Sequence, residues 1–204
     1  MATAQLEVVP DRFGYDPELH IYTIDNNEVP SVTQVIKPIS PFFGEPGYAA
    51  ELGDVVHQTC ALYSNGELDE WTVDPVVAPY LESWKGFLKA MGDKLAILAI
   101  EKRLYDERLR CAGTLDYFVR LKNRPAILDV KSGVSVGPEV GVQLAGYAML
   151  SANVPAAGYT IDRYAVHVTP DGEPARLIPF RDLDDLTEFR SLLNHYWWRK
   201  NHGK

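Results

Sequence analysis

The stretch that decides the fold runs from Gly113 to Gly133. It opens with Gly113-Thr114-Leu115-Asp116-Tyr117-Phe118-Val119 and closes with Ile127-Leu128-Asp129-Val130-Lys131-Ser132-Gly133. Both runs are mainly apolar, which is typical of strands. The segment between them, residues 120–125, is rich in Lys, Asn, Arg and Pro and indicates the turn of a hairpin. The sequence therefore predicts two antiparallel strands, each of which carries an aspartate.

Alternation along these strands predicts how the charged side chains are arranged. Asp129 and Lys131 share one face of their strand, whereas Val130 points to the other face. A turn centred near residues 122–124 permits two registers. One register sets Asp116 opposite Asp129, and the other sets Asp116 opposite Lys131 and diagonal to Asp129. Either register gathers two carboxylates and an ammonium group on one face.

Carboxylates that face each other on a sheet repel, and one of them tends to take up a proton. A divalent cation removes this conflict, and oxygen ligands suit Mg²⁺ or Mn²⁺. Lys131 is placed to orient an attacking water or to stabilise charge on a phosphate. Together these groups suit hydrolysis of a phosphodiester. The plainer alternative is a hairpin with a salt-bridged, solvated face, which Asp129-Val130-Lys131 alone favours.

A helix with a polar position on its apolar face is predicted after the hairpin. Gly137-Pro138 opens it, and Gln143 and Tyr147 lie four residues apart on the face that also holds Val140 and Leu150. A glutamine in an apolar stripe needs hydrogen-bond partners. The carboxylates, a bound water or a phosphate would supply them.

A second helix is predicted upstream, over Gly47 to Tyr63, with an apolar stripe that includes Val56 and Cys60. His57 lies on the flank of this stripe. A lone histidine on a helix is most often a structural residue. The residue pattern by itself therefore favours a structural role for His57.

Taken together, the motifs resemble the PD-(D/E)XK nuclease superfamily and, within it, the RecB-like branch. That branch includes phage and mitochondrial exonucleases and CRISPR-associated nucleases. Its Gly-x-x-Asp motif is matched by Gly113 to Asp116, its Asp/Glu-x-Lys motif by Asp129 to Lys131, and its Gln-x-x-x-Tyr motif by Gln143 to Tyr147. Its Gly-x-x-x-His motif resembles Gly53 to His57. The resemblance covers roughly residues 19–150, and its motifs are specific only in combination.

The resemblance implies a role for each matched residue. One or two ions of Mg²⁺ or Mn²⁺ would be held by His57, Asp116, Asp129 and, through its carbonyl oxygen, Val130. Lys131 would position or activate the water, and Gln143 and Tyr147 would support the lysine and the phosphate. Under this resemblance, His57 is a metal ligand rather than a structural residue.

The expected function is therefore metal-dependent hydrolysis of DNA phosphodiesters, as in exonucleases of phage recombination or repair. DNA would be the substrate, with its strandedness left open, and a recombination or replication protein would be a partner. Two alternatives stay open. One is a non-catalytic module of the same fold that binds DNA or a protein, and the other is an endonuclease on that fold.

Length and composition favour one domain with a full core, because the chain has 204 residues and is 46% hydrophobic. We expect an α/β fold of the PD-(D/E)XK type, in which a central mixed β-sheet is flanked by α-helices. The domain would span residues 1–204, with the motif core at about 47–150. An N-terminal hairpin and loop would occupy 19–46, and strands and a helix would occupy 158–200.

The chain shows no apolar run long enough to span a membrane and no secretion signal. Its two cysteines, Cys60 and Cys111, favour an intracellular protein, so we expect the cytoplasm of a bacterial or phage-infected cell. Some RecB-like relatives carry a four-cysteine iron–sulfur cluster. Two cysteines are too few for such a cluster, and none is expected within this chain.

The net charge of −8 argues against a generic nucleic-acid binder, but the charge is unevenly distributed. Residues 1–100 hold 5 Lys/Arg and 15 Asp/Glu, whereas residues 101–204 hold 15 and 13. We therefore expect modest, metal-dependent affinity for DNA rather than tight unspecific binding.

Three flanking segments carry further expectations. Ser31 and Gln34 form the pattern of a capping box at a helix start. A final helix is predicted over Asp182 to Arg199, with Leu183 among its inward residues. The basic end of that helix, Trp197 to Lys200, either grips a DNA strand or simply offsets the helix dipole.

Overall fold

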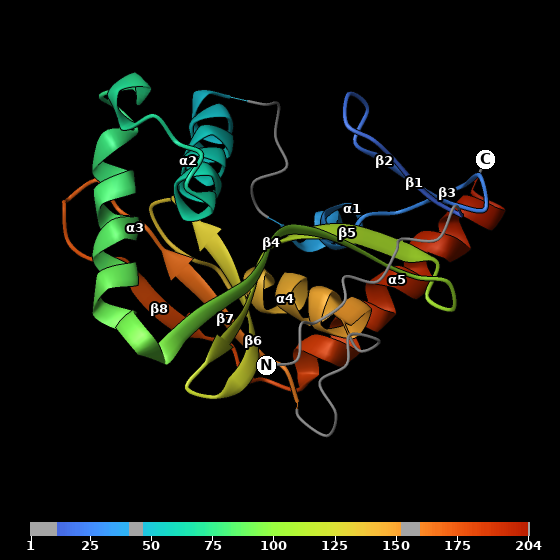
Figure 1. The fold of residues 1–204 in the computed structure, drawn as a ribbon. Coiled ribbons are helices and arrows are strands. Elements are labelled where there is room, and N and C mark those ends of the chain that lie inside the picture. The colour runs from blue at the N-terminus through green and yellow to red at the C-terminus, as the bar shows by residue number, and fades with distance from the viewer. Residues whose placement is uncertain (1–11, 41–46, 152–159, 204) are drawn as a thin grey trace.

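A five-stranded mixed sheet forms the centre of the fold (Figure 1). The structure is a computed structural model that describes residues 12–40, 47–151 and 160–203. The strands lie in the order β4-β5-β6-β7-β8 and comprise Leu95–Asp106, Cys111–Leu121, Arg124–Lys131, Asp162–His167 and Arg176–Pro179. Only β6 and β7 run parallel, and the other neighbours are antiparallel. This parallel pair is joined through helix α4, Glu139–Leu150.

The hairpin of β5 and β6 turns on two residues, Lys122 and Asn123, whose φ angles are 49° and 65°. Positive φ at both central residues is the geometry of the tight turn that matches the twist of paired strands. The printed pairing runs from Leu121 opposite Arg124 to Tyr117 opposite Leu128. The next step of this register sets Asp116 opposite Asp129, which is the first of the two predicted registers.

Helices cover both faces of the sheet (Figure 1). One face is covered by α2 (Tyr48–Asn65) and α3 (Ala78–Met91), and the other by α1 (Val32–Ile36), α4 and α5 (Asp184–His202). Strand β6 alternates between the two cores. Ile127 packs with α1, α4 and α5, whereas Leu128 and Val130 pack with α2 and α3. Asp129 and Lys131 have the parity of Ile127 and lie towards α4.

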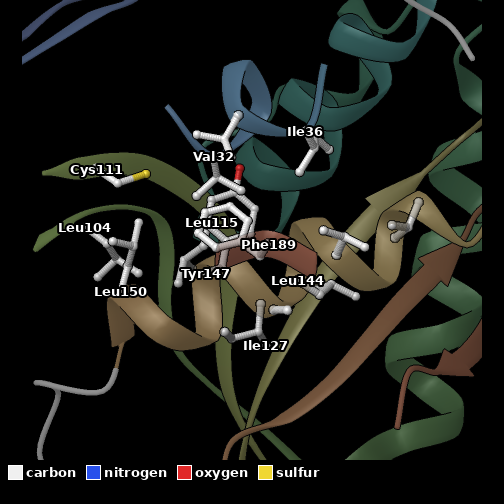
Figure 2. Close-up of a cluster of buried hydrophobic side chains, with 14 of the residues drawn as sticks. Val32, Ile36, Leu104, Cys111, Leu115, Ile127, Leu144, Tyr147, Leu150 and Phe189 are labelled. Carbon is white, nitrogen blue, oxygen red and sulfur yellow. The ribbon is translucent and has the colours of Figure 1, made fainter. Parts of the chain in front are cut away.

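The core on the α4 side is the one that shapes the site (Figure 2). Tyr147 and Leu144 from α4 lie against Leu115, Ile127 and the ring of Phe189 from α5. Val32 and Ile36 bring α1 onto the same cluster. The predicted apolar face of the Gln143 helix is therefore packed on the sheet, and its polar groups are fixed in place.

A smaller antiparallel sheet of β1 (Phe13–Asp16), β2 (Ile21–Ile24) and β3 (Asn27–Val29) precedes α1. It is joined to β5 by the hydroxyl groups of Tyr22 and Thr114, 2.8 Å apart. The predicted capping box is present at the start of α1. Ser31 Oγ accepts from the Gln34 amide, and the Gln34 side chain accepts from the Ser31 amide.

Some boundaries differ from those that the sequence suggests. The chain forms short 3₁₀ turns at Lys37–Ile39, Glu70–Thr72 and Gly92–Lys94. Leu183 was expected to point inward but is 74% exposed, because it precedes the first turn of α5 rather than lying within it.

The expectation of an α/β fold with a central mixed sheet flanked by helices is confirmed. No helix within the described ranges is both long enough and apolar enough to cross a membrane.

Candidate active site and metal centre

Asp116 lies at the end of the backbone pairing between β5 and β6, where its side chain bonds to the backbone of β6. The last printed pair is Tyr117 with Leu128, and one residue further Asp116 Oδ2 accepts a hydrogen bond from the Val130 amide at 2.7 Å. The carboxylate thus takes the place of a backbone acceptor at this end of the hairpin. Burial raises the pKa of Asp116, and the charge of Asp129 raises it further, against the opposing effects of His57 and Lys131.

Helix α2 carries His57 over Asp116. The imidazole Nδ1 lies 3.2 Å from Asp116 Oδ2, and the His57 side chain is 28% exposed. Its neighbours Val56 and Cys60 are fully buried against the sheet, which fixes the rotation of the helix about its axis. The structure therefore brings together two residues that are far apart in sequence. A Cβ at Gly53, one turn earlier, would lie 3.6 Å from Ser132 Oγ, an ordinary contact, so the approach of the helix does not require a glycine there.

Asp129 is the most deeply buried acid of the site, with 2% of its side chain exposed. Its Oδ2 lies 2.6 Å from Lys131 Nζ, the neighbour on the same face of β6. Burial alone would lower the pKa of Lys131, but the charges of Asp129 and Asp116 outweigh it and raise the pKa. The two carboxylates therefore favour the charged form of the lysine.

Val130 presents its backbone to the same edge. In a strand, the N–H and C=O of one residue point to the same side. Because the Val130 amide donates to Asp116, its carbonyl oxygen is also directed towards the β5 side. The expected carbonyl ligand is thus directed towards the carboxylates.

Gln143 and Tyr147 reach the site from α4. The Tyr147 hydroxyl is hydrogen-bonded to the side chains of Gln143 and Thr33, and burial followed by the charges of Asp129 and Asp116 raises its pKa. The phenol therefore stays protonated and can donate a hydrogen bond. The partners that Gln143 was expected to require include this hydroxyl.

Glu101 belongs to the same cluster, although the sequence reading left it out. The pairs that flank it, Ile100 with Tyr117 and Lys102 with Leu115, set Glu101 opposite Asp116 across β4 and β5. Three carboxylates thus lie in a row across three neighbouring strands. Glu101 has φ 49°, a left-handed conformation that side chains seldom adopt. Desolvation and the charge of Asp116 raise its pKa to about 7.

A signal for Glu101 existed in the sequence. The four-residue turn after Asp106 pairs Asp106 with Cys111. Counting back along both strands from this pair sets Glu101 opposite Asp116, just as counting from the next turn sets Asp116 opposite Asp129. The apolar residues at the start of β4 are typical of a buried strand and do not by themselves indicate a site residue.

His167, a second residue that the sequence reading missed, fixes the segment after Lys131. It pairs with Lys131 across the parallel strands β6 and β7 and is 2% exposed. Its Nδ1 lies 2.9 Å from Arg176 Nη2, and its Nε2 lies 2.7 Å from the Gly133 carbonyl oxygen. A guanidinium only donates, so Nδ1 accepts and Nε2–H donates to Gly133.

A pocket of about 510 Å³ opens beside these groups. Its lining includes Glu101, Thr114 and Tyr147, together with Tyr15 from β1 and Arg103 from β4. The Arg103 guanidinium lies 4.5 Å from the centre of the Tyr15 ring. Of the three carboxylates, Glu101 lines this space, which also has an aromatic and a cationic side chain in its lining.

The donor set fits a hard divalent cation. Carboxylate oxygens, a carbonyl oxygen and one imidazole are ligands that Mn²⁺ and Mg²⁺ accept. Burial, and then the charge of Asp129, raise the pKa of Asp116, and a cation would offset both effects. The residues are nevertheless engaged with each other. Within the three described segments, no three His, Cys, Asp or Glu side chains form a metal-binding group by themselves, so a cation has to compete with His57 and Lys131.

Comparisons with known proteins add little to this geometry. No family model matches the chain, and no curated protein matches it. The crystal structure of a provisionally named exonuclease from Eubacterium rectale is 14% identical, with a TM-score of 0.48, and the match covers 81% of this chain and 71% of that one. The crystal structure of SSO0001 is also 14% identical, with a TM-score of 0.34 and coverage of 84% and 85%. At this level of similarity, the argument about the chemistry rests on the site itself.

Proposed function

We propose that the chain is a metal-dependent nuclease that hydrolyses DNA phosphodiesters. The observation that carries the proposal is a convergence of four side chains from three elements, α2, β5 and β6, at one end of the hairpin: His57, Asp116, Asp129 and Lys131. A salt-bridged, solvated hairpin face would leave Asp129 exposed, yet 98% of its side chain is buried. Burial of charge at this cost is typical of functional sites.

Each residue has a defined task in this proposal. Asp116, Asp129, His57 and the Val130 carbonyl supply the ligands for Mg²⁺ or Mn²⁺. The bound metal would polarise the phosphate and lower the pKa of a water. The number of ions, one or two, is set by whether Glu101 also serves as a ligand.

Lys131 and the α4 pair act on the charge that develops at the phosphate. The Lys131 ammonium stabilises that charge and orients the water by a hydrogen bond. Tyr147 and Gln143 hold each other, and through them α4 fixes the position of the lysine and the phosphate. His167 positions Gly133 and with it the chain that follows Lys131.

By resemblance to RecB-like proteins, we propose an exonuclease of the phage recombination or repair type, working with a recombination or replication protein. An endonuclease on the same fold is the second candidate.

Incubation with end-labelled linear DNA and with closed circular DNA, each with and without Mn²⁺, tests the proposal. We expect mononucleotides from linear DNA in the presence of Mn²⁺ and no change in the circular form. Nicking or linearisation of the circle would assign an endonuclease. Metal-independent cleavage, or no cleavage of either DNA at any Mn²⁺ concentration, would contradict a metal-dependent nuclease.

A further inference from the structure

A second pocket, of about 630 Å³, lies on the other side of α1. It is formed by the end of α1, the 3₁₀ turn that follows, and the last turns of α5, which end beside the small sheet (Figure 1). Its polar and aromatic lining residues are Gln34, Lys37, His195, Tyr196, Arg199 and Lys200. We name this space the basic pocket.

The charge of the basic pocket is unusual for this chain. The protein has 28 acidic and 20 basic residues, yet among the described residues that line the pocket none is Asp or Glu and three are Lys or Arg. Glu28 lies outside the lining, where its charge acts on Tyr196 and its carbonyl oxygen accepts from Lys200. The pocket therefore attracts anions within an otherwise acidic protein.

The basic pocket adjoins the site. Gln34 lines both this pocket and the one that contains Glu101 and Tyr147. The Gln34 side chain is held by the capping box of α1, so it forms a fixed divide between the two spaces. The two pockets are therefore adjacent at the start of α1, with Glu101 and Tyr147 in the lining of one and the cations of α5 in the lining of the other.

The helix dipole offers a simpler account of part of this arrangement. Cations in the last turn of a helix offset its dipole, and Arg199 and Lys200 occupy the last turn of α5. Lys37, the C-cap residue of α1, comes from another element and faces the same pocket, so cations of two elements converge there. Among the residues that the structure describes, no carboxylate lines the pocket, and the dipole of α5 does not require this.

We infer that the basic pocket binds the phosphate backbone of a single DNA strand whose scissile end occupies the site. This inference rests on the proposed nuclease function and adds the path that the strand follows. Tyr196 and His195 supply ring faces on which a base can stack. The pocket contributes to holding long substrates and leaves the chemistry of the bond unchanged.

The test compares Lys37→Gln/Arg199→Gln with a control, Lys89→Gln/Lys122→Gln, which removes the same charge from α3 and the hairpin turn. Binding of a labelled single strand of about 12 nucleotides, within the range of single-strand sites, is measured by anisotropy in chelator across a salt series. The pocket variant should bind about tenfold more weakly at low salt, and its salt slope should fall by about 1.4, because each phosphate contact contributes about 0.7. The control should match the wild type.

Cleavage separates this inference from the proposed function. With Mn²⁺, the pocket variant should hydrolyse the p-nitrophenyl ester of thymidine 5′-monophosphate like the wild type, because this small substrate cannot reach the pocket. On the long strand its KM should rise while kcat is kept. A wild type that binds the strand but cuts neither substrate would refute the proposed function and leave the binding result standing.

Three results would overturn the inference. In the first, the pocket variant binds the strand with the wild-type affinity and salt slope. In the second, only its thermal stability falls, which would assign the cations to the helix dipole. In the third, polyglutamate displaces the labelled strand better than unlabelled DNA does when the two competitors are compared at the same concentration of negative charge. That result would indicate that the pocket binds an acidic protein.

Discussion

Asp129 is a carboxylate that the fold buries beside two other acids, and its replacement tests the ligand assignment. We predict that Asp116→Asn and Asp129→Asn abolish Mn²⁺-dependent cleavage and keep the fold. Asparagine at position 116 can still accept from the Val130 amide, whereas alanine would leave that amide unpaired at a cost of about 1–3 kcal/mol. Removal of the Asp116 charge relieves repulsion, so metal-free Asp116→Asn should unfold at an equal or higher urea concentration. Asp129→Asn also removes the partner of the Lys131 ammonium, so its metal-free form should unfold at a lower urea concentration. Wild-type cleavage by both variants would show that the site lies elsewhere.

Lys131 is held as a cation by Asp129 and Asp116, and its task in the proposal is electrostatic. Lys131→Ala should bind Mn²⁺ and DNA but cleave at least about a hundredfold more slowly, the scale for loss of one preorganised donor. Single-turnover rates with saturating enzyme measure this directly. An unchanged rate would exclude the lysine from the chemistry.

Glu101 gives a dependence on pH with a defined sign. Its pKa rises from the model-peptide value of 4.5 to about 7 in the fold. A raised carboxyl pKa means that the folded state loses stability as pH rises from about 4.5 to about 7 and the group ionises. Glu101→Gln removes this loss, so in chelator the urea midpoint of the variant should gain on the wild type between pH 5 and pH 8. A constant difference in urea midpoint across that range would show that the fold does not raise the pKa of Glu101.

Gly113 in β5 and Gly53 in α2 lie close to the site, and the space around them differs. At Gly113 an added Cβ would lie 2.9 Å from Tyr147 Cε1 and 3.3 Å from Val32 Cγ2, whereas at Gly53 the nearest atom is 3.6 Å away. Gly113→Ala should therefore cost about 1–3 kcal/mol and displace Tyr147. Gly53→Ala, the matched control in α2, should be neutral or stabilise by up to about 1 kcal/mol, because alanine favours a helix.

Urea unfolding and cleavage rates of the two glycine variants distinguish these effects. Equal losses at both positions would mean that the approach of α1 and α4 to β5 is not what requires Gly113.

The strands of the hairpin could be predicted from the sequence, but their register could not. The turn residues Lys122 and Asn123 both adopt positive φ. Lys-Asn differs from Asn-Gly and Asp-Gly, the residue pairs from which such a turn is usually predicted. Two registers therefore remained open until the pairing of Tyr117 with Leu128 was known. The capping box of α1 was predictable because it is a contact between residues three apart.

Contacts that depend on distant elements were beyond the sequence pattern. His57 approaches Asp116 only because Val56 and Cys60 bury the adjacent stripe of α2. The motif resemblance placed His57 in the site, whereas helical periodicity alone favoured a structural residue. No sequence pattern indicates that His167 lies near the site, because it is placed there by the parallel pairing of β6 with β7, two strands that α4 separates in the chain.

At the scale of the whole molecule, the two free cysteines report on the two cores. Cys60 lies in the core under α2 and α3, Cys111 lies in the core under α1, α4 and α5, and burial raises both thiol pKa values to about 12. If the sheet unfolds as one unit, both thiols should become labelled with the same free energy of opening. Peptide mapping after timed exposure to an alkylating reagent measures the two rates. Much faster labelling of one cysteine would show that its core opens independently.

The central claim is that His57, Asp116 and Asp129 form a site for a divalent metal. Calorimetric titration with Mn²⁺ tests it most directly, with wild type, His57→Ala, Asp129→Asn and the control Asp93→Asn, whose exposed carboxylate lies in the turn before β4. We predict that the control binds like the wild type, that His57→Ala binds more weakly because an imidazole favours Mn²⁺, and that Asp129→Asn loses the site. Equal Mn²⁺ affinities in all four proteins would contradict the account.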